Sequence, residues 1–156
     1  MLSIAARLRL RLGSTDYVSA FIQSGDIQRE LYVRPPRELS GPRGSLWQLH
    51  SLPYGIAEAN RKWSQIIDHW LINKLGFLRV PGLAQLYVRY NPERSANMVI
   101  AKVTDDLLIA GSCLNKKILF TSIKQRFNIN KEIMDSEILF NGAFITQDSN
   151  FNVTSF

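Results

Sequence analysis

Residues 98–111, with the sequence MVIAKVTDDLLIAG, decide the fold class of this chain. Two apolar segments, MVIAKV and LLIA, are rich in the residue types that form strands. Only Thr104, Asp105 and Asp106 separate them, and a polar interruption this short is typical of a tight turn. The stretch therefore predicts an antiparallel hairpin, with both carboxylates projecting from one end of a sheet.

A long amphipathic helix precedes this hairpin. Apolar residues recur at spacings of three and four over residues 56–75, and Gly76 follows as a natural helix end. We expect this helix to bury its apolar side against the sheet. The side chains expected in that contact are Trp63, Ile66, Ile67 and Trp70.

The rest of the chain is predicted to contain both helices and strands. Residues 2–12 fit both a helical face and an alternating strand, and we favour a helix that ends at Gly13. Further strands are predicted at 15–23, 30–34, 46–49, 84–90, 138–145 and 151–154, and a second long helix at 115–127. The frequent hairpins among these strands indicate an α+β fold, in which two helices back one face of an antiparallel sheet.

Composition limits the kinds of function. A hydrophobic fraction of 46% over 156 residues excludes a mainly disordered chain and allows one domain, or a large piece of one. The 19 Lys and Arg residues against 13 Asp and Glu give a net charge of +6, which favours a polyanionic partner such as nucleic acid. The single cysteine, Cys113, excludes a disulfide framework. No apolar run reaches the ~18 residues of a membrane span, so we expect an intracellular protein with no membrane partner.

Asp105 and Asp106 are the first candidates for chemistry. Adjacent carboxylates repel one another unless a cation lies near them, and Mg²⁺ prefers such oxygen ligands. Asp16 stands at the head of the predicted strand 15–23. If that strand lies beside the hairpin, three carboxylates converge, as two-metal phosphoryl transfer requires. The alternative is that the pair forms an ordinary turn and Asp16 a solvated strand end.

Two further places could contact a nucleotide. The ring of Phe21 could wall off the 2′ position of a sugar, or it could belong to the core. Tyr54 and Gly55 precede the long helix, where a glycine lets a ligand approach the backbone and the helix N-terminus favours anions. An ordinary turn is the alternative there. Arg61 and Lys62, in the second turn of the helix, face either phosphates or solvent.

Five motifs follow one another along the chain. They are TDYVSAFIQSG at 15–25, ELYVRPPREL at 30–39, LPYGIAEANRKW at 52–63, KVTDDLLIAGS at 102–112 and FNGAFI at 140–145. In this order and at these spacings they resemble the reverse transcriptase of copia-type LTR retrotransposons, with most similarity to the fungal branch. The resemblance extends from about residue 10 to residue 156.

The resemblance implies a polymerase palm with a ferredoxin-like core, which copies RNA into DNA and releases pyrophosphate. Asp16 resembles the first metal-binding aspartate of the family, Asp105 the second, and Asp106 its partner in the Asp-Asp pair. Mg²⁺ or Mn²⁺ is the implied cofactor, and an RNA or DNA template-primer and a deoxynucleoside triphosphate (dNTP) are the implied partners. In intact elements such proteins are cytoplasmic and associated with virus-like particles.

The resemblance also implies roles for binding residues. Phe21 corresponds to the bulky gate against ribonucleotides. Tyr54 and Gly55 match the turn that lies against the incoming nucleotide and the template. The residues that resemble the turn holding the primer end are Phe140, Asn141 and Gly142.

Departures from the family pattern bear on activity. Thr104 stands where members often carry valine, and Asn60 replaces the usual proline or glycine of the helix motif. The resemblance of residues 1–156 is to the palm and not to fingers, thumb or RNase H, so it implies a palm fragment of a Pol polyprotein. The alternatives are a catalytically inactive retroelement relic with at most nonspecific nucleic-acid binding, and a palm-type nucleotide cyclase. The motifs around Tyr54 and Phe140 argue against the cyclase.

Overall fold

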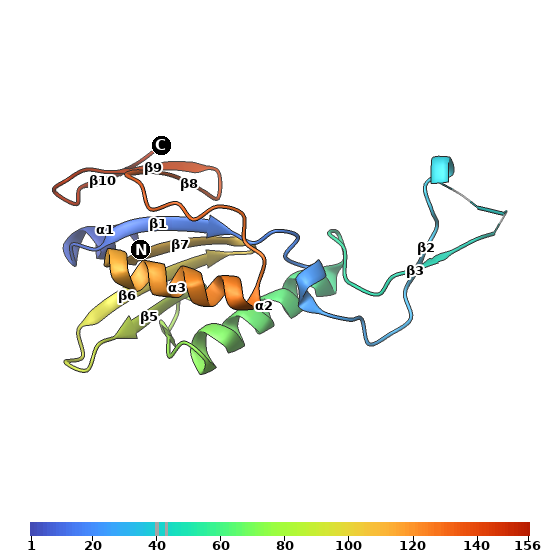
Figure 1. Cartoon of the computed structure of the whole chain (residues 1–156), viewed down its shortest axis with the longest axis horizontal. Coiled ribbons are helices and arrows are strands. Elements are labelled where there is room, and N and C mark those ends of the chain that lie inside the picture. Colours follow the sequence, from blue (N-terminus) through green and yellow to red (C-terminus); the bar gives the residue numbers. More distant parts are fainter. Residues whose placement is uncertain (40, 43) are drawn as a thin grey trace. The chain divides into compact units, whose positions relative to one another are not determined.

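The computed structural model describes residues 1–39, 41–42 and 44–156 (Figure 1). The chain forms two compact units, the first made of Met1–Val18 with Ile67–Phe156 and the second of Ser19–Ile66. Helix α2 (Ala57–Asn73) begins in the second unit and ends in the first. None of the helices in the described ranges combines the length and the apolar character needed to cross a membrane.

A five-stranded antiparallel sheet forms the centre of the first unit, in the order β1–β7–β6–β5–β4. Besides the end of α2, this unit contains α1 (Leu2–Arg7), β1 (Arg11–Asp16), β4 (Leu78–Arg79), β5 (Leu86–Tyr90), β6 (Ala96–Val103), β7 (Asp106–Gly111), α3 (Cys113–Arg126), β8 (Glu137–Phe140), β9 (Ala143–Gln147) and β10 (Val153–Ser155). The predicted hairpin is confirmed, because β6 and β7 pair antiparallel as far as Val103 and Asp106. The α+β fold with an antiparallel sheet is also confirmed.

One face of this sheet is covered by α1 and by a second, three-stranded sheet in the order β10–β9–β8. Leu108 and Ala110 of β7 are buried in one apolar cluster with Ala5 of α1, Ile138 of β8 and Ile145 of β9. Because side chains alternate along a strand, the neighbouring residues of β7 point to the opposite face. Both faces of the sheet are therefore apolar and covered.

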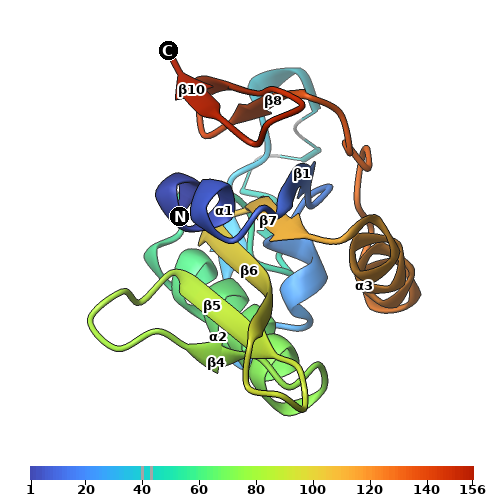
Figure 2. The ribbon, with the colours of Figure 1, turned by 90° about the vertical axis from the view of Figure 1, so that its left-hand side faces the viewer.

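Helices α2 and α3 cover that opposite face. Gly13 pairs with Ile109 and faces the side chain of Lys116 on α3. The rings of Trp70 on α2 and Phe127, just after α3, meet edge to face with their centroids 5.3 Å apart. Figure 2 shows α2 behind β5 and β6. The two helices expected behind the sheet are thus present, and a third helix, α1, lies on the other face.

The predicted first helix is wrong beyond Arg7, where α1 ends. Gly13 lies within β1 instead of ending a helix. A Cβ atom at position 13 would lie 2.8 Å from the carbonyl oxygen of Ile133, so this glycine serves a close approach of two backbones. The glycine signal is the same for a helix end and for such an approach, and the sequence alone did not separate them.

Two predicted strands have different boundaries. The strand expected at 15–23 is wrong, because β1 ends at Asp16 and residues 22–24 form a single 3₁₀ turn, η1 (Ile22–Ser24). The strand expected at 138–145 is two strands, β8 and β9, joined by Asn141 and Gly142. Both turn residues have positive φ, 48° and 77°, which matches the right-handed twist of a tight hairpin.

The long helix is confirmed with bounds of Ala57–Asn73. Trp63 and Ile67 are fully buried, as expected. Ile66 and Trp70 are only half-buried, so the expectation for these two is wrong. The fully buried positions follow a strict spacing of four and are Ala59, Trp63, Ile67 and Leu71.

The second unit has little regular structure outside α2. Its elements are η1, β2 (Tyr32–Val33), η2 (Arg37–Leu39) and β3 (Trp47–Gln48). The strands predicted at 30–34 and 46–49 are present as β2 and β3, which pair with each other antiparallel but are shorter than expected. Pro35 and Pro36 end the first of them, since proline cannot donate to a strand ladder.

Candidate functional site

Asp16 and Asp106 lie opposite each other at the same end of the sheet. Asp16 is the last residue of β1, Asp106 is the first of β7, and the two are paired in the antiparallel register. Directly opposed residues in a sheet project to the same face. This is the face covered by α1 and the β8–β10 sheet. Asp16 was expected at the head of a strand and stands at the end of one, but the pairing brings the two carboxylates together.

Asp105 lies in the turn between β6 and β7. Its carbonyl oxygen accepts a hydrogen bond of 2.9 Å from the N–H of Tyr17, which ties the turn to the end of β1. The other turn residue, Thr104, has a φ of 48°. A β-branched residue rarely adopts this left-handed conformation, and such strain is concentrated at functional sites.

The electrostatics of Asp106 reflect its neighbours. Burial raises the pKa of this carboxyl group, and the negative charges of Asp105 and Asp16 raise it further. The backbone N–H of Asn141 donates a hydrogen bond of 3.2 Å to Asp106 Oδ2, and this bond lowers the pKa of the carboxyl group. The three carboxylates are therefore close enough to repel, which is the condition that a bound cation relieves.

The turn expected to hold a primer end lies beside these carboxylates. Phe140, Asn141 and Gly142 line a cavity of about 300 Å³ together with Asp16 and Asp106. The structure thus brings five of the predicted site residues around one cavity.

A metal ion fits this donor set in part. Carboxylate oxygens are the ligands that Mg²⁺ and Mn²⁺ prefer, and Asp16 and Asp106 supply them from paired strands. Among the residues that the structure describes, however, no three His, Cys, Asp or Glu side chains are gathered as a metal-binding set. The paired carboxylates of Asp16 and Asp106 fit a divalent cation, and Asp105 is close enough to act on Asp106 by its charge.

The remaining predicted residues belong to the second unit. The rings of Phe21 and Tyr54 contact each other, with centroids 4.4 Å apart. Phe21 is buried and Tyr54 is 58% exposed, so the ring of Tyr54 is the outer one of this pair. Gly55 follows with a φ of 92°, a left-handed conformation that favours glycine.

Nothing in the sequence indicated the residues that tie the two ends of β1 to distant parts of the chain. The N–H of Asn130 donates a hydrogen bond of 3.1 Å to the carbonyl oxygen of Asp16. The buried side chain of Gln147 accepts from the N–H of Leu12 and donates to the carbonyl oxygen of Leu10, both at 3.0 Å. These bonds join β1 to segments more than 100 residues away, and no local pattern signals them.

Comparison with known proteins gives one family. The model of the family described as reverse transcriptase (RNA-dependent DNA polymerase) matches residues 1–153. The chain is 28% identical over 143 residues to the transposon Ty1-LR3 and Ty1-PR1 Gag-Pol polyproteins of Saccharomyces cerevisiae, which covers 89% of this chain and 8% of each relative. It has the same identity to the truncated transposon Ty1-A Gag-Pol polyprotein of that yeast, covering 11% of it. The chain thus spans about a tenth of these relatives or less, and no solved structure matches it.

Proposed function

Since the chain belongs to the reverse transcriptase (RNA-dependent DNA polymerase) family, as its resemblance to copia-type retrotransposons implied, we propose that it is the palm part of an RNA-directed DNA polymerase within a Pol polyprotein. The observation that carries this proposal is the pairing of Asp16 with Asp106 beside Asp105. A sheet with α2 and α3 on one face and the carboxylates on the other suits a palm with a ferredoxin-like core.

In this proposal Asp16, Asp105 and Asp106 hold Mg²⁺ or Mn²⁺. When bound, two such ions activate the 3′-hydroxyl of a primer and neutralise the leaving pyrophosphate. The neighbouring turn of Phe140, Asn141 and Gly142 holds the primer end. Its N–H bond to Asp106 fixes the distance between the turn and the carboxylates.

The second unit would hold the incoming dNTP. Tyr54 offers an exposed ring, Phe21 supports it and excludes a 2′-hydroxyl, and Gly55 leaves room beside the backbone. A template-primer of RNA and DNA is the macromolecular partner. In an intact element we propose that this happens in cytoplasmic virus-like particles.

Binding of Mn²⁺ tests the carboxylate site directly. We expect a titration with Mn²⁺ to broaden the backbone NMR signals of Asp16, Asp106 and Asn141 before other signals, because the ion is paramagnetic and would bind between the carboxylates. The variants Asp16→Asn and Asp106→Asn should lose this selective broadening.

Asp135→Asn is the matched control, because Asp135 is an exposed carboxylate outside the cavity. Its loss should leave the broadening near Asp16 and Asp106 unchanged. If Asp16→Asn and Asp106→Asn broaden like the unmodified chain, the carboxylates do not hold the metal. The rival proposal, an inactive relic that binds nucleic acid only through its basic surface, would then be favoured.

A further inference from the structure

A second cleft lies within the second unit. It has a volume of about 340 Å³ and is lined by residues 27–29, by Leu52 and by one side of α2. The α2 residues in the lining are Glu58, Arg61, Lys62 and Gln65. Their spacing of three and four places them on one face of the helix. Arg61 and Lys62, expected from the sequence to face phosphates or solvent, line this cleft, whereas Asp16, Asp105 and Asp106 do not.

Cross-links between its walls fix the shape of the cleft. Arg29 forms an ion pair of 2.7 Å with Glu58, which joins the segment 27–29 to α2. The ammonium group of Lys62 donates a hydrogen bond of 2.5 Å to the carbonyl oxygen of Asp26 and holds the same segment one turn further along the helix. The N–H of Ile27 donates to the carbonyl oxygen of His50 at 2.9 Å. Side chain and backbone together therefore preform the walls.

The charges in the cleft do not cancel. Glu58 neutralises Arg29, but Lys62 is held by carbonyl oxygens, which leave its charge uncompensated. Arg61 lies between Glu58 and Lys62 on the same face, is exposed, and has no ion-pair partner among the described residues. The cleft thus presents two net positive charges, and one of them is a guanidinium group free to bind a ligand.

We propose that this cleft binds a phosphate group, with Arg61 as the main ligand and Lys62 and Gln65 beside it. A guanidinium fork donates two parallel hydrogen bonds to a phosphate, and a nearby ammonium group adds charge without a fixed direction. The side-chain amide of Gln65 adds a neutral donor. A charge of two matches one phosphate group better than a single carboxylate, which carries one negative charge.

The phosphate can come from the backbone of a nucleic-acid strand or from a free anion such as pyrophosphate. The site does not depend on the carboxylates of the first unit, and binding needs no divalent cation. Binding can therefore be measured in EDTA, where metal-dependent binding at Asp16 and Asp106 is absent. Loss of phosphate binding in this cleft can therefore be distinguished from loss of metal binding at Asp16 and Asp106.

Binding of two probes to the full chain tests the proposal. One is a fluorescein-labelled 12-mer of single-stranded DNA, followed by anisotropy at several salt concentrations, and the other is inorganic pyrophosphate, followed by calorimetry. We expect Arg61→Gln to weaken binding of the DNA about tenfold, the loss expected for a charged hydrogen-bonding group. It should also make the salt dependence shallower by about one phosphate contact. Arg61→Lys should recover only part of the affinity, because lysine keeps the charge and loses the fork.

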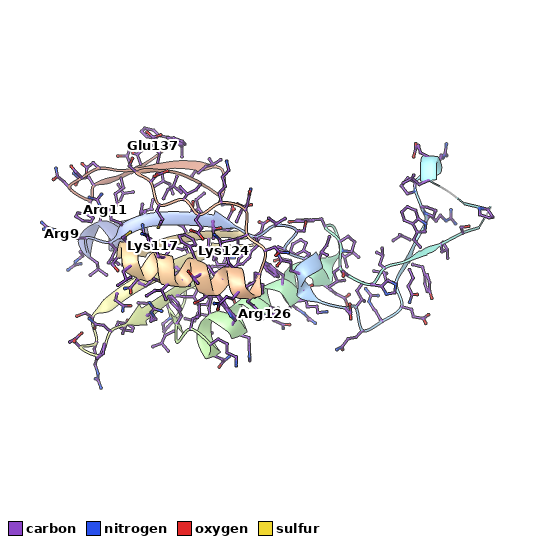
Figure 3. All side chains as sticks on the ribbon, in the orientation of Figure 1. Arg9, Arg11, Lys117, Lys124, Arg126 and Glu137 are labelled. Carbon is purple, nitrogen blue, oxygen red and sulfur yellow. The ribbon has the colours of Figure 1, made fainter. Side chains whose placement is uncertain are left out.

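Lys117→Gln is the matched control. Lys117 is an exposed basic residue on helix α3, outside the cleft (Figure 3), and its replacement removes the same charge. A larger loss of DNA affinity for Arg61→Gln than for Lys117→Gln supports a backbone phosphate in the cleft. A loss of pyrophosphate affinity alone supports a phosphate site for a free anion. Equal effects of the two variants on both probes would overturn the proposal, because only general electrostatic attraction would remain.

Discussion

The ionised carboxylate of Asp106 destabilises the fold, and a bound cation would relieve this effect. Burial and the charges of two other aspartates raise its pKa, so the folded chain binds a proton there more readily than the unfolded chain does. For a group whose pKa is raised on folding, stability is greatest at low pH and falls as the pH rises towards the folded pKa. At neutral pH the ionised carboxylate therefore destabilises the fold.

The variant Asp106→Asn should accordingly be more stable than the unmodified chain at pH 7. We expect a gain of less than about 1 kcal/mol, because the side chain is only half-buried and solvent screens part of the repulsion. The gain should shrink as the pH falls, because the raised pKa lets the aspartate of the unmodified chain bind a proton and lose its charge. Thermal melts of both proteins between pH 4 and pH 8 measure this difference. A variant that melts below the unmodified chain at pH 7 would contradict the electrostatic account.

Single residues differ in how far their roles can be predicted from the sequence. The Asp105-Asp106 pair is visible in sequence because two apolar strands enclose it. Gly13 is visible but ambiguous, because its role depends on the carbonyl oxygen of Ile133, 120 residues further along the chain. Gln147 carries no signal, since a glutamine next to a turn is ordinary until its distant partners Leu10 and Leu12 are known.

At the scale of elements, a partly buried ionic network joins α2 to the sheet. The two carboxylate oxygens of Asp68 on α2 accept from Tyr87 of β5, Lys102 of β6 and Arg79 of β4. Lys102 is 3% exposed, and burial lowers the pKa of its ammonium group while Asp68 opposes that change. Burial also raises the pKa of the Tyr87 hydroxyl group, and Asp68 adds to this shift. The network fixes the helix across three strands.

Breaking this network from one side should be costly. Asp68→Asn removes the negative charge that the buried ammonium group of Lys102 contacts, and we expect a loss of ~3 kcal/mol in the free energy of unfolding, the lower end for a broken buried pair. Lys102→Met removes the charge and keeps much of the volume, so it should cost less. Urea denaturation of the two variants and of the double variant gives the comparison. If Lys102→Met is as damaging as Asp68→Asn, packing and not charge holds the helix in place.

The elements themselves were predictable where a periodic pattern was long. The spacing of three and four over α2 and the apolar runs of β6 and β7 gave the correct types, since local burial decides them. Boundaries near β1 were not predictable. The residues after Asp16 are rich in β-branched and aromatic types, but their pairing within the described ranges stops at an isolated bridge between Tyr17 and Ile129, and strand formation depends on pairing. β4 was missed because it has only two residues, Leu78 and Arg79.

At the scale of the whole molecule, the net charge of +6 is a binding property in itself. Five basic side chains lie along α3 and around the start of β1 (Figure 3). They are Arg9, Arg11, Lys117, Lys124 and Arg126. Lys124 is paired with Glu132, and Arg11 lies over the ring of Phe151, so part of this charge is engaged within the chain. What remains suits weak contacts to phosphates that have no sequence preference and weaken with salt.

Weak binding of nucleic acid does not amount to polymerisation. We expect the 156-residue chain by itself to show no measurable primer extension on an RNA template with Mg²⁺. Aligning a 3′-hydroxyl, a template base and a triphosphate contributes ~7–11 kcal/mol to such a reaction, and we propose that these residues form only the palm part of the polymerase. Asp16 and Asp106 supply ligands for metal but do not fix the other reactants. A primer-extension gel measures the activity, with Asp105→Asn as the control and filter binding as the check that the chain still binds the template-primer. Extension that appears with the unmodified chain and vanishes in the variant would mean that these residues align primer, template and triphosphate unaided. The expectation of no activity would then be wrong.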